Sequence, residues 1–198
     1  KQPFAKFIEA NVGDGVLVVC GLPGSWKTET CEEVARIKGF PILRTDLIRL
    51  NVLKGQDVFD EKVAANMDKR VAVYEEMFRQ AEQVLSREKG VILDATFVTQ
   101  ELRKRAANIA ARHKLAFTIM QTDCPQEVSI RRILARTKEN YESNALDEKA
   151  YLNNKKNFDK VDITDIRQSC PNLKITHFIV DTRADPPDGW YVTGVEKC

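Results

Sequence analysis

Residues 16–38 read VLVVCGLPGSWKTETCEEVARIK and carry the strongest indication of the fold. Residues 16–20 form the short apolar run that is typical of a buried strand. Residues 28–38 carry apolar side chains at helical spacing, at Cys31, Val34 and Ala35. Between them lies a glycine-containing turn that ends in Lys-Thr. A strand, such a turn and then a helix is the context in which this motif binds phosphate, so the stretch predicts a nucleotide site.

The turn over residues 21–28 has the groups that phosphate needs. Its backbone N–H groups, together with those at the start of the helix, form a concave set of donors for phosphate oxygens. Lys27 would place a positive charge beside the β- and γ-phosphates of ATP, and the Thr28 hydroxyl would hold magnesium. The remaining residues that we expect to contact the nucleotide are Gly21, Pro23, Gly24, Ser25 and Trp26.

Trp26 stands where this motif has its last glycine. If the backbone there needs a positive φ, a side chain costs roughly 1–2 kcal/mol, which a fold can absorb. The steric question is larger and has two answers. An indole directed at the phosphates would block the β-phosphate site, whereas one directed outward would cover the nucleotide or pack against a lid.

Bulk properties narrow the class of protein. The 198 residues suit one medium domain, and 31 basic against 29 acidic residues give a formal charge of +2, too little for nucleic-acid binding through bulk charge alone. No apolar run approaches the ~20 residues that span a membrane.

The five cysteines show no ligand spacing, which favours reduced thiols and a cytoplasmic location. The chain starts at Lys1 rather than methionine, which would suit a domain excised from a longer chain, with a fused or partner domain.

Strands and helices alternate along the chain, which predicts a parallel sheet covered by helices on both faces, an α/β fold. After residues 16–20, we expect strands at 41–44, 91–93, 116–120 and 177–180. We expect helices at 46–53, 60–89, 99–113, from 125 onward, at 148–158 and at 163–168. Residues 138–147 are polar and aperiodic and predict a mobile loop, within a lid at about 132–150. The tail around Pro186, Pro187 and Gly189 predicts irregular structure.

Ligands of open parallel sheets bind outside the carboxyl ends of the strands, and charged residues follow several of the predicted strands. Asp94 ends an apolar strand and could bind the Thr28 hydroxyl or a magnesium-bound water, or could simply cap a helix or form a turn. Asp46 and Arg49, one helical turn apart, could be the base and the clamp for an acceptor hydroxyl, or an N-cap and an exposed arginine.

Arg132 and Arg136 lie four residues apart on the helix that precedes the predicted loop. Phosphoryl transfer concentrates negative charge on the γ-phosphoryl oxygens, and an arginine that closes over them stabilises this charge. A solvated basic stripe would show the same spacing. Their position before the predicted lid favours the functional interpretation.

Together these motifs resemble the small P-loop kinases of the AAA-type ATP-binding group, relatives of polynucleotide kinase, zeta toxin and gluconate kinase. The resemblance spans roughly residues 16 to 160. It is especially similar to a module fused to aminoglycoside-phosphotransferase-like domains. The stretches that carry it are Gly21 to Thr28, Thr45-Asp46-Leu47-Ile48-Arg49 with Gly55, Val91 to Phe97 with Arg103, and Arg132 with Arg136.

The resemblance implies a three-layer αβα sandwich with a five-stranded parallel sheet, ordered 2-3-1-4-5. It also implies that Asp46 is the general base and that Arg49 contacts the acceptor. We expect Arg103 to contact the acceptor as well; the alternative is that Arg103 and Arg105 form only a basic helix face. Lys27, Asp46 and Arg136 would then be catalytic, with Arg132 and Arg136 on the nucleotide and Thr28 and Asp94 on magnesium.

We therefore expect an ATP-dependent kinase that phosphorylates a hydroxyl of a small molecule or of a nucleic-acid end. The alternative is a nucleotide-binding module that Trp26 has weakened catalytically.

Overall fold

The computed structural model describes residues 1–52, 67–135, 148–185 and 188–198. Its centre is a mixed sheet in the order β1-β7-β6-β5-β2-β4-β3. Neighbouring strands from β3 to β6 are parallel, and β7 and β1 add antiparallel pairs at one edge. The strands are β1 (Gln2–Pro3), β2 (Gly15–Cys20), β3 (Ile42–Arg44), β4 (Val91–Asp94), β5 (Ala116–Asp123), β6 (Ile175–Asp181) and β7 (Tyr191–Lys197).

The predicted order 2-3-1-4-5 is confirmed for the parallel strands, which are β3-β4-β2-β5-β6 when read across the sheet. The prediction of a five-stranded, wholly parallel sheet is wrong, because β7 and β1 extend it with antiparallel pairs to seven strands in the described part of the chain. The prediction of an irregular tail is wrong for residues 191–197. Trp190 and Val192 are buried there, and β7 pairs with β6 along its length. Residues 188–189 form a turn that ends before the strand begins, so the turn does not make the rest of the tail irregular. Pro186 and Pro187 lie outside the described residues.

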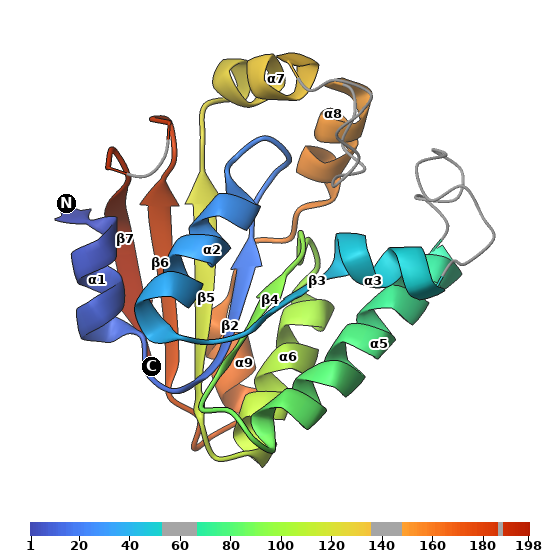
Figure 1. Ribbon diagram of the computed structural model, residues 1–198, viewed down its shortest axis with the longest axis vertical. Helices are drawn as coiled ribbons and strands as arrows, with labels where there is room; N and C mark the ends of the chain where they lie inside the picture. Colours follow the sequence, from blue (N-terminus) through green and yellow to red (C-terminus); the bar gives the residue numbers. More distant parts are fainter. Residues whose placement is uncertain (53–66, 136–147, 186–187) are drawn as a thin grey trace.

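The helices form two layers and a partial cover at the top (Figure 1). They are α1 (Phe4–Asn11), α2 (Lys27–Lys38), α3 (Thr45–Val52), α5 (Met67–Leu85), α6 (Gln100–Arg112), α7 (Gln126–Ala135), α8 (Glu148–Asn157) and α9 (Ile163–Ser169). The predicted helices at 28–38, 46–53, 99–113, 148–158 and 163–168 agree with these bounds to within a residue or two. The predicted helix 60–89 is confirmed over α5, but its predicted end is wrong, because the helix ends at Leu85 and residues 86–89 form a turn and a bend. Residues 60–66, Gly55 and the predicted loop 138–147 lie outside the described residues.

Alternate residues of β2 face two apolar clusters. Val16, Val18 and Cys20 belong to the cluster with α5, α6 and α9, whereas Leu17 and Val19 belong to the one with α1 and α2. Every residue of β2 is buried, as expected for the central strand of a sheet that helices cover on both faces. None of the helices in the described ranges is long and apolar enough to cross a membrane. All five cysteines are free thiols.

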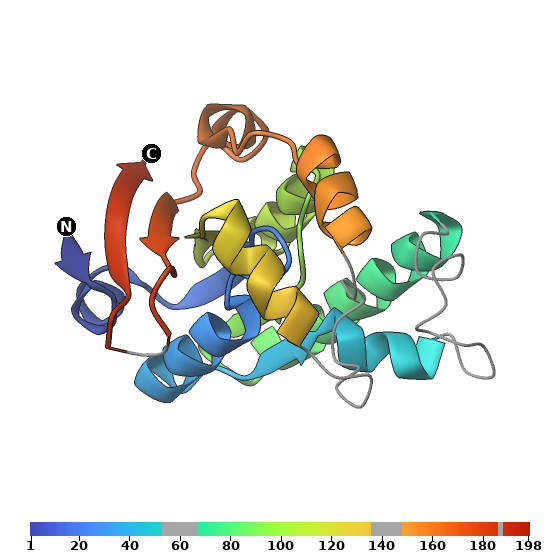
Figure 2. The same ribbon diagram turned by 90° about the horizontal axis from the view of Figure 1, so that it is seen from above.

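The parallel strands direct their carboxyl ends to one edge of the sheet, below α7 and α8 (Figure 1). Seen from above, α7 runs across this edge (Figure 2). The turn from β2 to α2, the start of α3 and the end of β4 therefore meet in one place, where the sequence predicts the site.

Candidate active site

The loop between β2 and α2 adopts a phosphate-binding shape that includes a tryptophan in a glycine conformation. Trp26 has φ 61° and ψ 38°, which is left-handed backbone, and it is the N-cap residue of α2. Gly24 also has a positive φ of 76°, and a Cβ atom there would come within 2.5 Å of the Ser129 carbonyl oxygen on α7. The loop thus keeps the backbone path that glycine would allow, and α7 packs directly against it.

Hydrogen bonds from outside the loop fix the direction of its peptide groups. Thr182, just after β6, donates to the Ser25 carbonyl at 2.8 Å, and Arg132 on α7 donates to the Gly24 carbonyl at 3.2 Å. In a planar trans peptide the N–H points opposite to the carbonyl. The N–H groups of Ser25 and Trp26 are therefore directed toward the inside of the loop, as a cluster of phosphate donors requires.

Lys27 and Thr28 begin α2 and lie beside the end of β4. The Lys27 ammonium donates to the Leu22 carbonyl at 3.1 Å, so it spans the loop. The Thr28 hydroxyl donates to Asp94 Oδ2 at 2.8 Å, and Arg44 Nε lies 3.5 Å from the same oxygen. The predicted pairing of Thr28 with Asp94 is present.

Asp94 is only 6% exposed. Burial raises the pKa of its carboxyl group, while the Thr28 hydrogen bond and the charges of Lys27 and Arg44 oppose this rise. A hydroxyl and a carboxylate in contact fit the oxygen chemistry of magnesium. Within the described ranges no three His, Cys, Asp or Glu side chains gather to hold a metal by themselves. A magnesium ion at Thr28 and Asp94 would therefore need phosphate and water oxygens as further ligands.

Asp46 and Arg49 form an ion pair at the start of α3, with Asp46 Oδ1 3.2 Å from Arg49 Nη1. Thr45 links this helix to β4, since its hydroxyl donates to the Asp94 carbonyl at 3.5 Å. Burial raises the pKa of the Asp46 carboxyl; Arg49 opposes the rise, and the charge of Asp94 adds to it. The two carboxylates and Lys27 are thus near enough to influence one another, as the sequence predicts.

The Trp26 indole packs against the apolar cluster on the α1 and α2 face of the sheet. The Arg132 guanidinium lies over its ring, 4.7 Å from the centroid. Of the two directions open from the sequence, this is the outward one, toward the cover helix α7. Within the described part of the chain, the buried indole N–H has no hydrogen-bond acceptor.

Arg132 joins three loops at the edge of the sheet. Besides Gly24, it donates to Cys124 Sγ at 3.3 Å, to the Thr182 carbonyl at 2.8 Å and to the Arg183 carbonyl at 2.7 Å. The sequence led us to predict that Arg132 contacts the nucleotide, but it did not predict these contacts with protein groups. The nucleotide contact of Arg132 stays a prediction, and Arg136 lies outside the described residues.

The structure places Arg103, the third predicted acceptor contact, away from solvent with 0% exposure. Its guanidinium donates to the carbonyls of Phe97 and Val98, at 2.9 and 3.2 Å. It also donates to Gln100 Oε1 and lies over the Phe158 ring, so its nitrogen atoms are engaged with the protein, and its contact with the acceptor stays a prediction.

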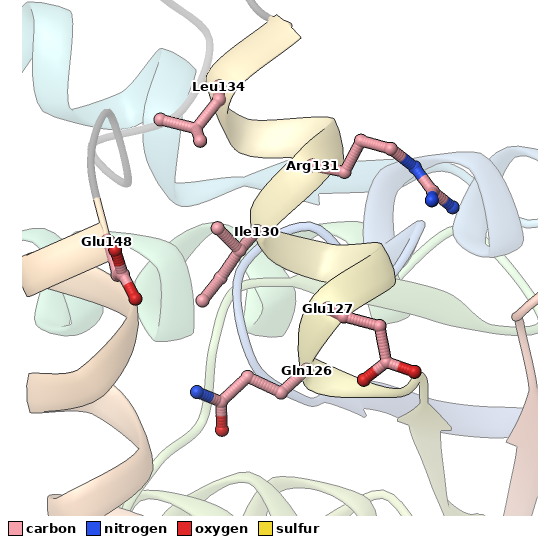
Figure 3. A pocket seen from close by; sticks show the side chains of 6 residues that line it. All are labelled: Gln126, Glu127, Ile130, Arg131, Leu134 and Glu148. Atoms are coloured by element: carbon pink, nitrogen blue, oxygen red, sulfur yellow. The ribbon is translucent and has the colours of Figure 1, made fainter.

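Two hollows lie at this edge of the molecule. The smaller, of about 210 Å³, is lined by the loop residues Gly21, Leu22 and Ser25, the end of β5, and Lys155 and Phe158. The larger, of about 740 Å³, lies between α7 and α8, and Ile130 and Leu134 point into it toward Glu148 (Figure 3). The smaller hollow therefore adjoins the first half of the phosphate loop, whereas Lys27, Thr28, Asp46 and Asp94 are not among the residues that line it.

Several residues around the loop were not foreseen from the sequence. Thr122 and Thr182 hold the loop from neighbouring strand ends, and Gly21 must lack a Cβ because that atom would come within 1.9 Å of Thr122 Oγ1. The signal was present in the polar residues Gln121-Thr122-Asp123, which extend β5 past the predicted end at 120.

Comparison with known proteins gives the same picture. A family model described as "AAA domain" (AAA_33) matches residues 16–161. A Mycobacterium tuberculosis H37Rv protein, "Uncharacterized protein Rv2004c", is 29% identical over 133 residues, covering 65% of this chain but 27% of that relative. A Sinorhizobium meliloti gluconokinase has a TM-score of 0.56 at 19% identity, over 87% of this chain and 85% of its own. Chaetomium thermophilum Kti12, solved with ADP-AlF3, gives 0.56 at 19% identity, over 75% of this chain and 82% of its own.

A parallel arrangement of the central strands, a phosphate loop after β2 and an aspartate at the end of the adjacent strand β4 define a P-loop nucleoside-triphosphatase fold. The chain belongs to the AAA domain family AAA_33. The expected likeness to small P-loop kinases is confirmed at the level of family and fold.

Proposed function

We propose that the chain is an ATP-dependent phosphotransferase that moves the γ-phosphoryl group to a hydroxyl of an acceptor. The observation that carries this proposal is the 2.8 Å hydrogen bond between Thr28 and Asp94. It lies beside Lys27 and a loop whose Ser25 and Trp26 N–H groups are turned inward. The kinase-type fold of its structural neighbours supports it.

Each residue of the site has a role in this proposal. The backbone N–H groups of residues 21–28 and Lys27 bind the phosphates, with Lys27 leaving the Leu22 carbonyl for phosphate oxygens. Thr28 and Asp94 would hold magnesium, which neutralises charge on the β- and γ-phosphates. Arg132 and Arg136 would lie beside the nucleotide.

Asp46 is the proposed base. Its carboxyl group accepts the proton of the acceptor hydroxyl as that oxygen bonds to the γ-phosphorus, while the bond from this phosphorus to the bridging oxygen breaks and ADP leaves. Arg49 orients the acceptor. A pKa raised by burial suits this task, because a more basic carboxylate takes a proton more readily. The acceptor class is a small molecule or a nucleic-acid end, since a formal charge of +2 gives no reason to expect a long polyanion.

The test compares two lysines at opposite ends of α2. Lys27→Ala should reduce magnesium-dependent ATP turnover by at least ~100-fold, as expected when a positioned charge is removed from a phosphoryl-transfer site. Lys38→Ala, at the last residue of the helix, should leave turnover unchanged. Equal turnover in Lys27→Ala and the wild type would overturn the proposal.

A second candidate function is a nucleotide-binding module with little catalysis, and Trp26 favours it, because Arg132 is held on the indole and on protein carbonyls. Calorimetry of ATP binding with Trp26→Gly separates the two. The kinase proposal expects affinity and turnover within about threefold of the wild type. If tryptophan is the inactivating feature, both should rise more than ~10-fold.

We also propose a cytoplasmic location and a fused or partner domain. The match to the M. tuberculosis relative covers 27% of that protein, which leaves room for further domains in proteins of this kind. Fractionation of cells that express the full-length protein, followed by mass spectrometry, tests both.

A further inference from the structure

Arg103 is a charged side chain with no exposed surface, on the second turn of α6. Its Nε donates to the Phe97 carbonyl at 2.9 Å, and its Nη2 donates to the Val98 carbonyl at 3.2 Å. Its Nη1 donates to Gln100 Oε1 at 3.3 Å. A buried guanidinium needs such partners, and here two of them are backbone groups of the segment that follows Asp94.

That segment contains a strained residue. Phe97 has a φ of 42°, in the left-handed region that a bulky side chain rarely adopts. Two groups hold it in place, since the Tyr74 hydroxyl accepts the Phe97 N–H at 3.2 Å while Arg103 binds its carbonyl. Strain of this kind persists only where the surroundings enforce it, and it clusters at functional sites.

The same arginine also contacts the segment after α8. Its guanidinium lies over the Phe158 ring, 4.8 Å from the centroid. The next residue, Asp159, donates its N–H to the Val98 carbonyl at 2.8 Å and accepts the Gln100 N–H at 2.9 Å. Phe158 lines the hollow beside the phosphate loop, so these contacts connect the end of α8 to the segment after Asp94.

We propose that Arg103 is a positioning residue, which holds the segment after Asp94 and the end of α8 in the arrangement that phosphoryl transfer needs. It acts through the Phe97 and Val98 carbonyls and the Phe158 ring, not through contact with substrate. The inference rests on the proposed function. It predicts that loss of Arg103 affects the magnesium side of the site more than the binding of ATP, because Asp94 lies three residues before Phe97 in this segment and the phosphate loop has its own supports.

Arg105 provides a matched control on the same helix. Its guanidinium lies over the Phe78 ring at the same 4.8 Å, but its ion pair is with Glu75 on α5. Within the described part of the chain it makes no direct contact with residues 95–98 and reaches them only through Phe78, whose ring lies 6.3 Å from that of Phe97. We compare Arg103→Lys with Arg105→Lys. In Arg103→Lys, kcat should fall about 10- to 100-fold and the half-saturating magnesium concentration should rise several-fold, as for groups that orient metal ligands. ATP affinity by calorimetry should stay within about threefold.

Hydrogen exchange supplies a readout that does not depend on turnover. Arg103→Lys should speed exchange at the Phe97 and Asp159 amides together, and Arg105→Lys should not. If the wild type shows no ATP turnover, the proposed function fails, and the exchange result still decides the link between the two segments. If Arg103→Lys matches Arg105→Lys in kcat, magnesium dependence and exchange, the inference is wrong.

Tyr74→Phe covers the case in which Arg103→Lys does not fold. It removes the acceptor of the Phe97 N–H and leaves Arg103 in place. A smaller change in the same direction, with a lower kcat and a higher magnesium requirement at constant ATP affinity, supports the proposal. An unchanged kcat and magnesium requirement would contradict it.

Discussion

Trp26 allows a clean separation of backbone strain from side-chain packing. Its φ of 61° puts it in the left-handed region, and it is the N-cap of α2 without a side-chain cap hydrogen bond. We consider the series Trp26→Phe, Trp26→Ala and Trp26→Gly. Alanine keeps the strain and loses the ring, glycine loses both, and phenylalanine keeps both but lacks the indole N–H.

The magnitudes follow from these differences. A Cβ atom in left-handed backbone destabilises the folded alanine variant by roughly 1–2 kcal/mol. Glycine offsets part of this difference, because its greater freedom in the unfolded chain lowers the stability of the glycine variant by roughly 0.5–1 kcal/mol. The glycine variant should therefore be about 1 kcal/mol more stable than the alanine variant. Phenylalanine keeps a ring under Arg132 and a contact with the apolar cluster, so it should exceed alanine by about 2 kcal/mol. The wild type should lie close to phenylalanine, because its larger buried surface is offset by an indole N–H without an acceptor.

Urea unfolding followed by far-UV circular dichroism measures this series, and melting temperature provides a second readout. A difference of 1 kcal/mol corresponds to about 2–4 °C in a domain of this size. Urea midpoints should fall in the order phenylalanine, glycine, alanine. An alanine variant as stable as the glycine variant would refute the reasoning, since residue 26 would then not be held in the left-handed region.

Two further predictions concern the carboxylate beside Thr28 and the contact of the loop with α7. Asp94→Asn should lower kcat about 10- to 100-fold, because the amide is a poorer ligand and partner for Thr28. Burial raises the pKa of the Asp94 carboxyl in the folded state. The wild type should therefore lose stability relative to Asp94→Asn as the pH rises from about 4, the pKa in the unfolded chain, through the raised folded pKa. Urea titrations of both proteins at several pH values check this, and a stability difference that changes with pH in the opposite direction would contradict it. Gly24→Ala should lower the free energy of unfolding by about 2–5 kcal/mol, because the position has a positive φ and the new Cβ would lie 2.5 Å from the Ser129 carbonyl oxygen. Gly39→Ala is the control, since it has a φ of 74° but open space around its Cβ, and it should cost only about 1–2 kcal/mol in the same unfolding assay.

Local pattern and one topological rule were sufficient to predict much of the site. The apolar run 16–20, the Lys-Thr after the turn, and aspartates at strand ends are local features, and parallel strands bring their carboxyl ends together. Lys27, Thr28, Asp46 and Asp94 could therefore be placed at one edge without coordinates. The strand at 191–197 could not, because its burial depends on Trp190 and Val192 covering the α1 side of the sheet, a contact between distant parts of the chain.

The arginines show why residue type alone was not enough. Arg49, Arg103 and Arg132 look alike in sequence, as cations on helices at the active edge. The structure gives Arg49 a carboxylate partner and Arg103 the carbonyls after β4. It gives Arg132 the carbonyls of two loops and the thiol of Cys124 in a third. The partner of a guanidinium depends on how deeply its helix buries it and on the direction of nearby carbonyl groups. Neither can be predicted from the local sequence.

A tryptophan at position 26 leaves the backbone path of the phosphate loop intact but adds a side chain that contacts α7. The indole supports the Arg132 guanidinium, and Arg132 holds the Gly24 carbonyl outward, which turns the Ser25 N–H inward. A glycine at position 26 would remove this support and leave the shape of the loop to Thr182, Ser25 and Gly24. In this chain the inward direction of the Ser25 N–H group, which phosphate binding would require, therefore depends on the position of α7. Any ligand that moves α7 should change the affinity of the loop for phosphate, and by linkage phosphate should change the affinity for that ligand by the same factor.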